Sequence, residues 1–67
     1  MKKEFKLGDK VKVIKNIDIN GKEVDQYDAY YIVTNINGNE IELSSEKNGM
    51  LYKWATIKKN NLKKVEE

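Results

Sequence analysis

Three Asn-Gly pairs, at residues 20–21, 37–38 and 48–49, constrain the fold of this chain more than any other feature of its sequence. Asn and Gly both tolerate positive φ angles, so the pair is a strong signal for a tight β-hairpin turn. The segments around these pairs either alternate apolar and polar residues or are rich in β-branched and aromatic residues; they are residues 10–15, 30–34, 41–43 and 51–57. No segment has the apolar spacing of an amphipathic helix. The sequence therefore predicts an all-β antiparallel meander.

The hairpin around Asn37-Gly38 can be registered from its turn. With these two residues at the centre, the facing pairs are Ile36 with Asn39, Thr34 with Ile41 and Ile32 with Leu43. The predicted core face of this hairpin then carries Ile32, Ile36, Ile41 and Leu43. A three-residue loop would instead turn Tyr31 and Val33 inward, and a bulge would reconcile the two arrangements. The core that we expect consists of Val11, Val13, Ile32, Ile41, Leu43, Ala55, Ile57, Leu62 and Val65.

Four consecutive polar residues, 58–61, interrupt the last apolar alternation before Leu62 and Val65 resume it. We expect a single 3₁₀ turn here, with Leu62 covering one end of the sheet and a short fifth strand behind it. The predicted order is one strand, a long hairpin-like loop, three strands joined by tight turns, one polar turn and a final strand.

Residues 5–13, Phe-Lys-Leu-Gly-Asp-Lys-Val-Lys-Val, resemble the first strand of bacterial SH3-like and KOW-like domains, in which a Gly-Asp turn precedes alternating valines. Residues 31–43 and 54–65 are similar to the small SH3-like repeats at the C-termini of phage and clostridial endolysins. The resemblance covers residues 5–65. It implies one domain over residues 1–67, a five-stranded antiparallel SH3-like barrel with one 3₁₀ turn before the last strand. It implies no single function, because such barrels bind peptides, cell walls or nucleic acids or serve structure alone.

The chain contains no His and no Cys, and its basic residues are all lysine. The usual bases, the best nucleophile and the commonest zinc ligands are therefore missing, and the acidic residues lack the spacing of a calcium loop. We expect no enzymatic activity, no metal and no cofactor. The first fifteen residues alternate charged and apolar side chains without a continuous apolar segment. We therefore expect no signal peptide, no membrane span and a cytoplasmic location.

Tyr52 and Trp54 lie two residues apart in the predicted fourth strand, so their side chains share one face. We expect this face to be opposite the core and beside the long loop, whose acidic residues would give it a negative rim. The residues of this predicted aromatic site are Tyr27, Tyr30, Tyr52, Trp54, Asp25 and Asp28. Such a surface suits a protein or peptide partner with basic residues. In the alternative interpretation, Trp54 covers an open end of the barrel and only supports the fold.

Lysines gather at the two ends of the sequence. Residues 1–17 and 47–67 each carry six lysines and two acidic residues, whereas residues 18–46 carry one lysine and seven acidic residues. Because the first and last strands pair in the predicted fold, these ends should form one basic face. The residues of this predicted lysine face are Lys10, Lys12, Lys15, Lys58, Lys59, Lys63 and Lys64. It would bind nucleic-acid backbone without sequence preference or an acidic protein, or it would simply keep the protein soluble.

Three functions are compatible with the sequence. The sequence favours a protein-interaction or adaptor module, encoded by a bacterium, a phage or a mobile element, that acts through the aromatic site. The second is a nucleic-acid-binding protein that uses the lysine face. The third, implied by the endolysin resemblance, is a cell-wall-binding unit.

Overall fold

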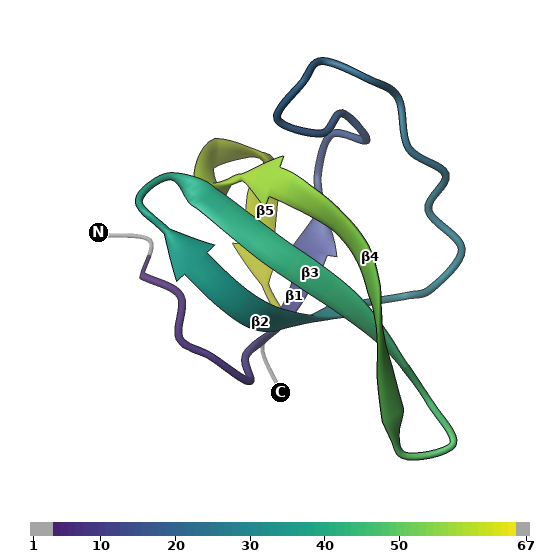
Figure 1. Cartoon of the computed structure of the whole chain (residues 1–67). Helices are drawn as coiled ribbons and strands as arrows, with labels where there is room; N and C mark the ends of the chain where they lie inside the picture. Colours follow the sequence, from purple (N-terminus) through teal and green to yellow (C-terminus); the bar gives the residue numbers. More distant parts are fainter. Residues whose placement is uncertain (1–3, 66–67) are drawn as a thin grey trace.

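The computed structural model describes residues 4–65, which form an antiparallel five-stranded sheet, one 3₁₀ turn and a long loop (Figure 1). The elements are β1 (Lys10–Val13), β2 (Tyr31–Asn37), β3 (Glu40–Lys47), β4 (Met50–Lys58), η1 (Lys59–Asn61) and β5 (Leu62–Lys64). These elements confirm the predicted all-β class, the five strands and the position of the 3₁₀ turn. Residues 1–3 and 66–67 of the predicted domain lie outside the described residues.

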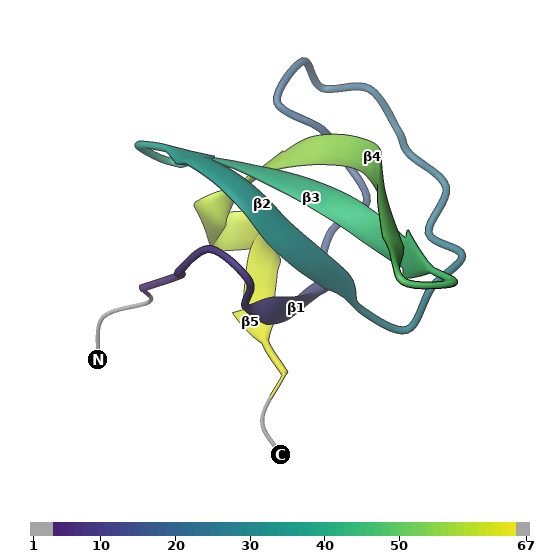
Figure 2. The ribbon, with the colours of Figure 1, turned by 60° about the horizontal axis from the view of Figure 1, so that its bottom comes forward.

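The order of strands across the sheet is β4-β3-β2-β1-β5, so β4 and β5 are its two edges (Figure 2). Within residues 4–65, no strand pairing joins these two edges, and the sheet is therefore not closed into the predicted barrel. The reason is the corner at η1, where the chain leaves β4 and β5 then pairs with β1 instead. Two hydrogen bonds hold this corner, from Lys59 N to the Asn39 carbonyl and from Ile14 N to the Asn61 carbonyl, both 2.7 Å long.

The β2–β3 hairpin turns at Gly38-Asn39, one residue later than the sequence predicts. Asn37 pairs with Glu40 across the turn, and Gly38 has a φ of 62° whereas Asn39 is not among the residues with positive φ. Glycine in the first central position is the pattern of a type II′ turn. The predicted register, with Asn37-Gly38 at the centre, is wrong because only the glycine takes the left-handed conformation.

A β-bulge in β2 decides which of its side chains are buried. Val33 pairs with Leu43 and Asn35 pairs with Glu42, which leaves Thr34 between them without a cross-strand partner. As a result Tyr31 and Val33 are buried, as in the bulged alternative, while Ile32 is only half-buried. Ile32 is therefore not the core residue that the simple register predicts.

The remaining core agrees largely with the sequence. The predicted core residues that are buried are Val11, Val13, Ile41, Leu43, Ile57 and Leu62. Ala55 and Val65, which were also expected inside, are half-buried. Phe5, Tyr31 and Val33 complete the buried cluster.

The β3–β4 hairpin turns at Asn48-Gly49, whose φ angles of 54° and 77° are both positive, as in a type I′ turn. Further along, Leu43 pairs with Ala55 but Ser44 pairs with Lys53, so a second bulge leaves Trp54 unpaired. Because of this bulge, Trp54 and Ala55 both pack against the core although they are adjacent in sequence. The prediction that Trp54 faces away from the core is wrong, since it assumed strict alternation.

Candidate binding surfaces

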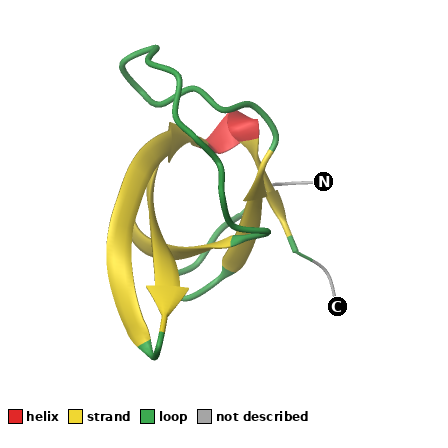
Figure 3. Cartoon of the chain, turned by 90° about the vertical axis from the view of Figure 1, so that its right-hand side faces the viewer, coloured by secondary structure: helices red, strands yellow, loops and turns green. Residues whose placement is uncertain are grey.

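The long loop between β1 and β2, residues 14–30, is attached to the sheet along β4 (Figure 3). Ile19 N donates to the Thr56 carbonyl at 3.1 Å, and an isolated bridge joins Ile17 to Glu23 inside the loop. The carboxylate of Asp18 accepts the backbone N–H groups of two later loop residues, each at 2.9 Å, and so closes a tight turn. The loop is thus held in one place beside β4, where it carries several of the predicted site residues.

Trp54 and Tyr31 attach this loop to the sheet. Their rings are stacked, with centroids 3.9 Å apart and planes inclined by 7°. The indole Nε1 of Trp54 donates to the Asp25 carbonyl at 2.9 Å. The hydroxyl of buried Tyr31 accepts the backbone N–H groups of Tyr27 at 3.1 Å and Asp28 at 3.2 Å. One face of the Trp54 ring therefore contacts Tyr31, and its N–H bonds to the loop. Both contacts agree with the alternative interpretation, in which Trp54 supports the fold.

Of the two predicted acidic rim residues, only Asp25 has an exposed side chain. Asp28 is half-buried, and its carboxylate accepts a short hydrogen bond from the hydroxyl of buried Ser45. Tyr27 is 61% exposed; its ring meets the Tyr31 ring edge-on with centroids 6.4 Å apart, and Lys47 Nζ lies 5.3 Å from the Tyr27 ring centroid. The negative rim is therefore smaller than expected, and the positive charge of Lys47 lies next to it.

The other two predicted aromatic residues lie elsewhere. Tyr30 has Lys10 Nζ 5.0 Å from its ring centroid, and Tyr52 contacts the sulfur of Met50 near the β3–β4 turn. Among the described residues, neither ring stacks on the Trp54–Tyr31 pair. The structure thus gathers Tyr27, Trp54, Asp25 and Asp28 around Tyr31, which the sequence suggested only as a core residue.

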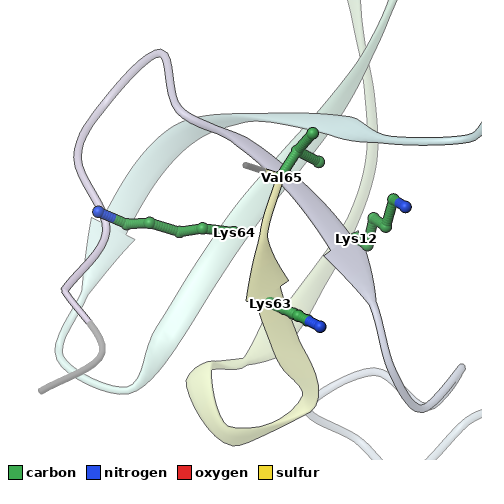
Figure 4. A pocket seen from close by; sticks show the side chains of 4 residues that line it. All are labelled: Lys12, Lys63, Lys64 and Val65. Carbon is green, nitrogen blue, oxygen red and sulfur yellow. The ribbon is translucent and has the colours of Figure 1, made fainter. Parts of the chain in front are cut away.

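The lysine face is built by the pairing of β1 with β5. Lys12 stands directly opposite Lys63, and Val11 opposite Lys64. Figure 4 shows Lys12 and Lys63 extending to one side of the two strands and Lys64 to the other. These three lysines and Val65 line a shallow hollow of about 220 Å³. Alternation along β1 puts exposed Lys10 on the same face as Lys12.

Acidic residues compensate little of this positive charge. Lys64 Nζ lies 3.5 Å from the Asp9 carboxylate, but within residues 4–65 neither Lys12 nor Lys63 forms an ion pair. Like charges directly opposite on neighbouring strands destabilise a sheet. Among the described residues, the pair of Lys12 and Lys63 is therefore a point of positive charge without an ion-pair partner on the exposed surface.

The other predicted lysines border the η1 corner. Lys58 ends β4 and is exposed, Lys59 begins η1 and is half-buried, and Lys15 follows the residue whose N–H bonds to Asn61 in η1. The structure thus places four of the seven lysines on β1 and β5 and the other three around the η1 corner. Lys12 and Lys63 extend to one side of the β1–β5 pair, which Lys10 shares by alternation, and Lys64 extends to the other side.

Comparisons with known protein families, with curated proteins and with solved structures find no match for this chain. In the part that the structure describes, no group of three His, Cys, Asp or Glu side chains is placed to hold a metal ion. That same part includes no helix with the length and apolar character needed to cross a membrane.

Proposed function

We propose that this chain is a non-enzymatic binding module whose lysine face contacts the phosphate backbone of a nucleic acid. The observation that supports this proposal most is the direct opposition of Lys12 and Lys63 across β1 and β5. The two charges repel each other in the unbound protein, whereas a phosphate between them would attract both. Binding would thus relieve a local cost of the fold.

The chemistry of the face indicates how such binding would occur. All its cations are lysines, which act as compact point charges and lack the planar fork with which arginine reads guanine edges. The hollow at the face is shallow, so no base would be enclosed in it. We expect binding to be independent of sequence, modest in affinity and strongly weakened by salt, because it depends on the release of counterions from phosphates.

We further propose that the chain is an SH3-like domain from a bacterium or phage and that it works in the cytoplasm. The strand order β4-β3-β2-β1-β5, the long loop after β1 and the 3₁₀ turn before β5 support this assignment. The open gap between β4 and β5 is where the chain departs from a closed barrel. The assignment places no constraint on the ligand, since SH3-like domains have many functions.

Fluorescence anisotropy with labelled single- and double-stranded DNA and RNA, measured over a salt series, tests the proposed binding. We expect the double variant Lys12→Gln with Lys63→Gln to bind more weakly to every sequence. Its slope of log affinity against log salt should be shallower by roughly 2, one for each lost phosphate contact. The matched control is Lys22→Gln with Lys47→Gln, which lowers the net charge equally but away from the lysine face.

The control separates a defined face from a general effect of charge. If both double variants lose affinity equally, only net charge matters and the lysine face is not a site. If the unchanged protein binds none of the nucleic acids at low salt, the proposed function is wrong.

A second candidate, a protein or peptide partner, is favoured by the exposed ring of Tyr27 beside the exposed carboxylate of Asp25. A basic peptide would find an aromatic surface and a negative charge there. Titration with a lysine-rich peptide, followed by NMR, should then shift the amide signals around Tyr27, and Tyr27→Ala should abolish the shifts. Shifts that survive in Tyr27→Ala would rule this site out. No feature of the two surfaces favours a cell-wall ligand.

A further inference from the structure

The two edges of the sheet differ in how well they are protected against pairing with another chain. β5 has only three residues, two of them lysines, and short charged edges resist such pairing. β4 has nine residues, and its end near the turn carries three consecutive exposed apolar side chains. They are Met50, Leu51 and Tyr52, which are 59%, 51% and 52% exposed. An apolar, exposed edge strand is a ready template for another strand.

Within residues 4–65, the chain covers only the other half of β4. The loop reaches Thr56 through the Ile19 N–H, and it reaches Trp54 through the Asp25 carbonyl. Figure 1 shows the turn end of the β3–β4 hairpin projecting beyond the rest of the sheet, away from the loop. In the part of the chain that the structure describes, the half of β4 nearest the turn is therefore uncovered.

The hairpin geometry tells which backbone groups of this half point outward. Lys47 and Met50 flank a two-residue turn and so bond to each other, which by alternation leaves Leu51 and Lys53 facing away from β3. The bulge at Trp54 adds one residue to β4, so beyond it the outward positions shift by one and include Thr56. The Thr56 carbonyl does point outward, since it accepts the Ile19 N–H of the loop. Within residues 4–65, no other segment bonds to the outward N–H and C=O groups of Leu51 and Lys53.

We propose that this open half of β4 pairs antiparallel with the same segment of a second copy of the chain, about a two-fold axis at Tyr52. In this register Leu51 faces Lys53 of the second copy, and the two Tyr52 residues face each other. Every outward N–H and C=O group of Leu51 and Lys53 then has a partner. The two sheets become one continuous sheet.

The side chains favour a second copy as the occupant, because the segment is complementary to itself in this register. Lys53 lies opposite an apolar residue and not opposite another lysine, so no like charges meet. Beyond this Leu51, on the same face, lies Glu46 of the second copy, which is the β3 partner of Leu51. Its negative charge is opposite to that of Lys53. On the other face the two tyrosines form an aromatic cross-strand pair. A register centred on Lys53 would instead oppose two lysines.

The proposal is independent of the lysine face, but it has a consequence for it. A dimer carries two lysine faces, and binding of the first to a nucleic acid would raise the effective concentration of the second near the same strand.

Single-cysteine cross-linking tests the register, since the chain has no cysteine of its own. In a non-hydrogen-bonded antiparallel pair the Cα atoms are about 4.5 Å apart, within the range of a disulfide. We therefore expect Tyr52→Cys to form a disulfide dimer under mild oxidation. Leu51→Cys alone and Lys53→Cys alone should not, because their symmetry mates would be about 8 Å apart. A mixture of these two variants should cross-link as a heterodimer, since their positions face each other.

Cross-linking of all three variants to the same extent, or of none, would overturn the proposed register. Both outcomes are read on a non-reducing gel and need only transient pairing.

Sedimentation equilibrium over a range of concentrations tests the association itself. Proline at an outward position of an edge strand removes no hydrogen bond of the monomer. Leu51→Pro should therefore abolish dimers while the circular dichroism spectrum stays unchanged. The matched control is Leu7→Pro, which removes another exposed leucine at a turn where Gly8 has a φ of 90° and Asp9 N bonds to the Lys6 carbonyl, a position that suits proline.

We expect Leu7→Pro to dimerise like the unchanged protein. If the unchanged protein remains monomeric at millimolar concentration, or if Leu51→Pro associates equally well, the proposal is wrong. A monomer whose β4 signals shift only when a different chain is added would assign the edge to that chain instead.

Discussion

The indole ring of Trp54 lies flat against the ring of Tyr31, with 3.9 Å between ring centroids and 7° between ring planes. Tyr31 belongs to β2 and Trp54 to β4, so the stack spans the intervening strand β3. Each ring also holds the loop, Trp54 through the Asp25 carbonyl and Tyr31 through its hydroxyl. The stack is therefore the joint between sheet and loop.

Trp54→Ala should destabilise the protein by about 2 to 4 kcal/mol, somewhat below the cost for a fully buried tryptophan, because it removes the stack and releases the loop. Urea unfolding followed by circular dichroism measures this loss. Tyr52→Ala, an exposed aromatic residue in the same strand, is the control and should cost less than about 1 kcal/mol. Equal stability of the two variants would mean that Trp54 contributes little to the fold.

Tyr31→Phe removes only the hydroxyl that accepts the N–H groups of Tyr27 and Asp28. We expect a loss of about 1 to 3 kcal/mol, since these backbone donors lose a buried acceptor. Amide hydrogen exchange provides the specific readout: exchange at Tyr27 and Asp28 should accelerate more than exchange in β3. Unchanged exchange at both amides would contradict the role assigned to the hydroxyl.

Gly38→Ala tests the position of the β2–β3 turn. Its φ of 62° is unfavourable for an L-residue, so alanine should cost about 1 to 2 kcal/mol although the site is open to solvent. Asn39→Ala should cost less than about 0.5 kcal/mol, because Asn39 does not take a positive φ. Asn37→Ala should be equally mild, since Asn37 does not take a positive φ either. A loss in thermal unfolding as large as that of Gly38→Ala would instead support the register centred on Asn37-Gly38, whose type I′ turn needs a positive φ at both residues.

Ile41→Ala tests the core face. Ile41 is 1% exposed, and its truncation should cost about 2 to 5 kcal/mol, a large share of the stability of so small a domain. Ile36, its cross-strand partner, is 38% exposed and is the matched control. We expect Ile36→Ala to be clearly milder in urea unfolding, and similar losses would show that both residues are core.

The sequence predicted those parts of the fold that depend on local patterns. Alternation marked β1 and β4, the Asn-Gly pairs marked both hairpins, and four polar residues marked η1, because turns and strands of this kind are specified by nearby residues. The register failed by one residue at Gly38. An Asn-Gly pair is equally compatible with a type I′ turn on both residues and a type II′ turn that begins at the glycine.

The aromatic site was predicted less well, for a reason that lies in the bulges. Strict alternation put Trp54 outside, but the extra residue in β4 turned it toward the core together with Ala55. Bulges depend on contacts between distant segments, in this case those of Trp54 with Tyr31 and the loop. No local sequence pattern predicts them. The opposition of Lys12 and Lys63 could be predicted from the pairing of the first and last strands, a property of the overall topology.

The pairing of β1 with β5 also has a consequence for the order of folding. β2, β3 and β4 are linked by two-residue turns and can form early, whereas β1 and β5 come from opposite ends of the described chain and must close a loop that contains nearly all of it. This late step brings Lys12 against Lys63, so added salt, which screens the repulsion, should speed it. A refolding rate that rises with moderate salt, and loses this dependence in Lys63→Gln, would identify closure of the β1–β5 ladder as the slow step.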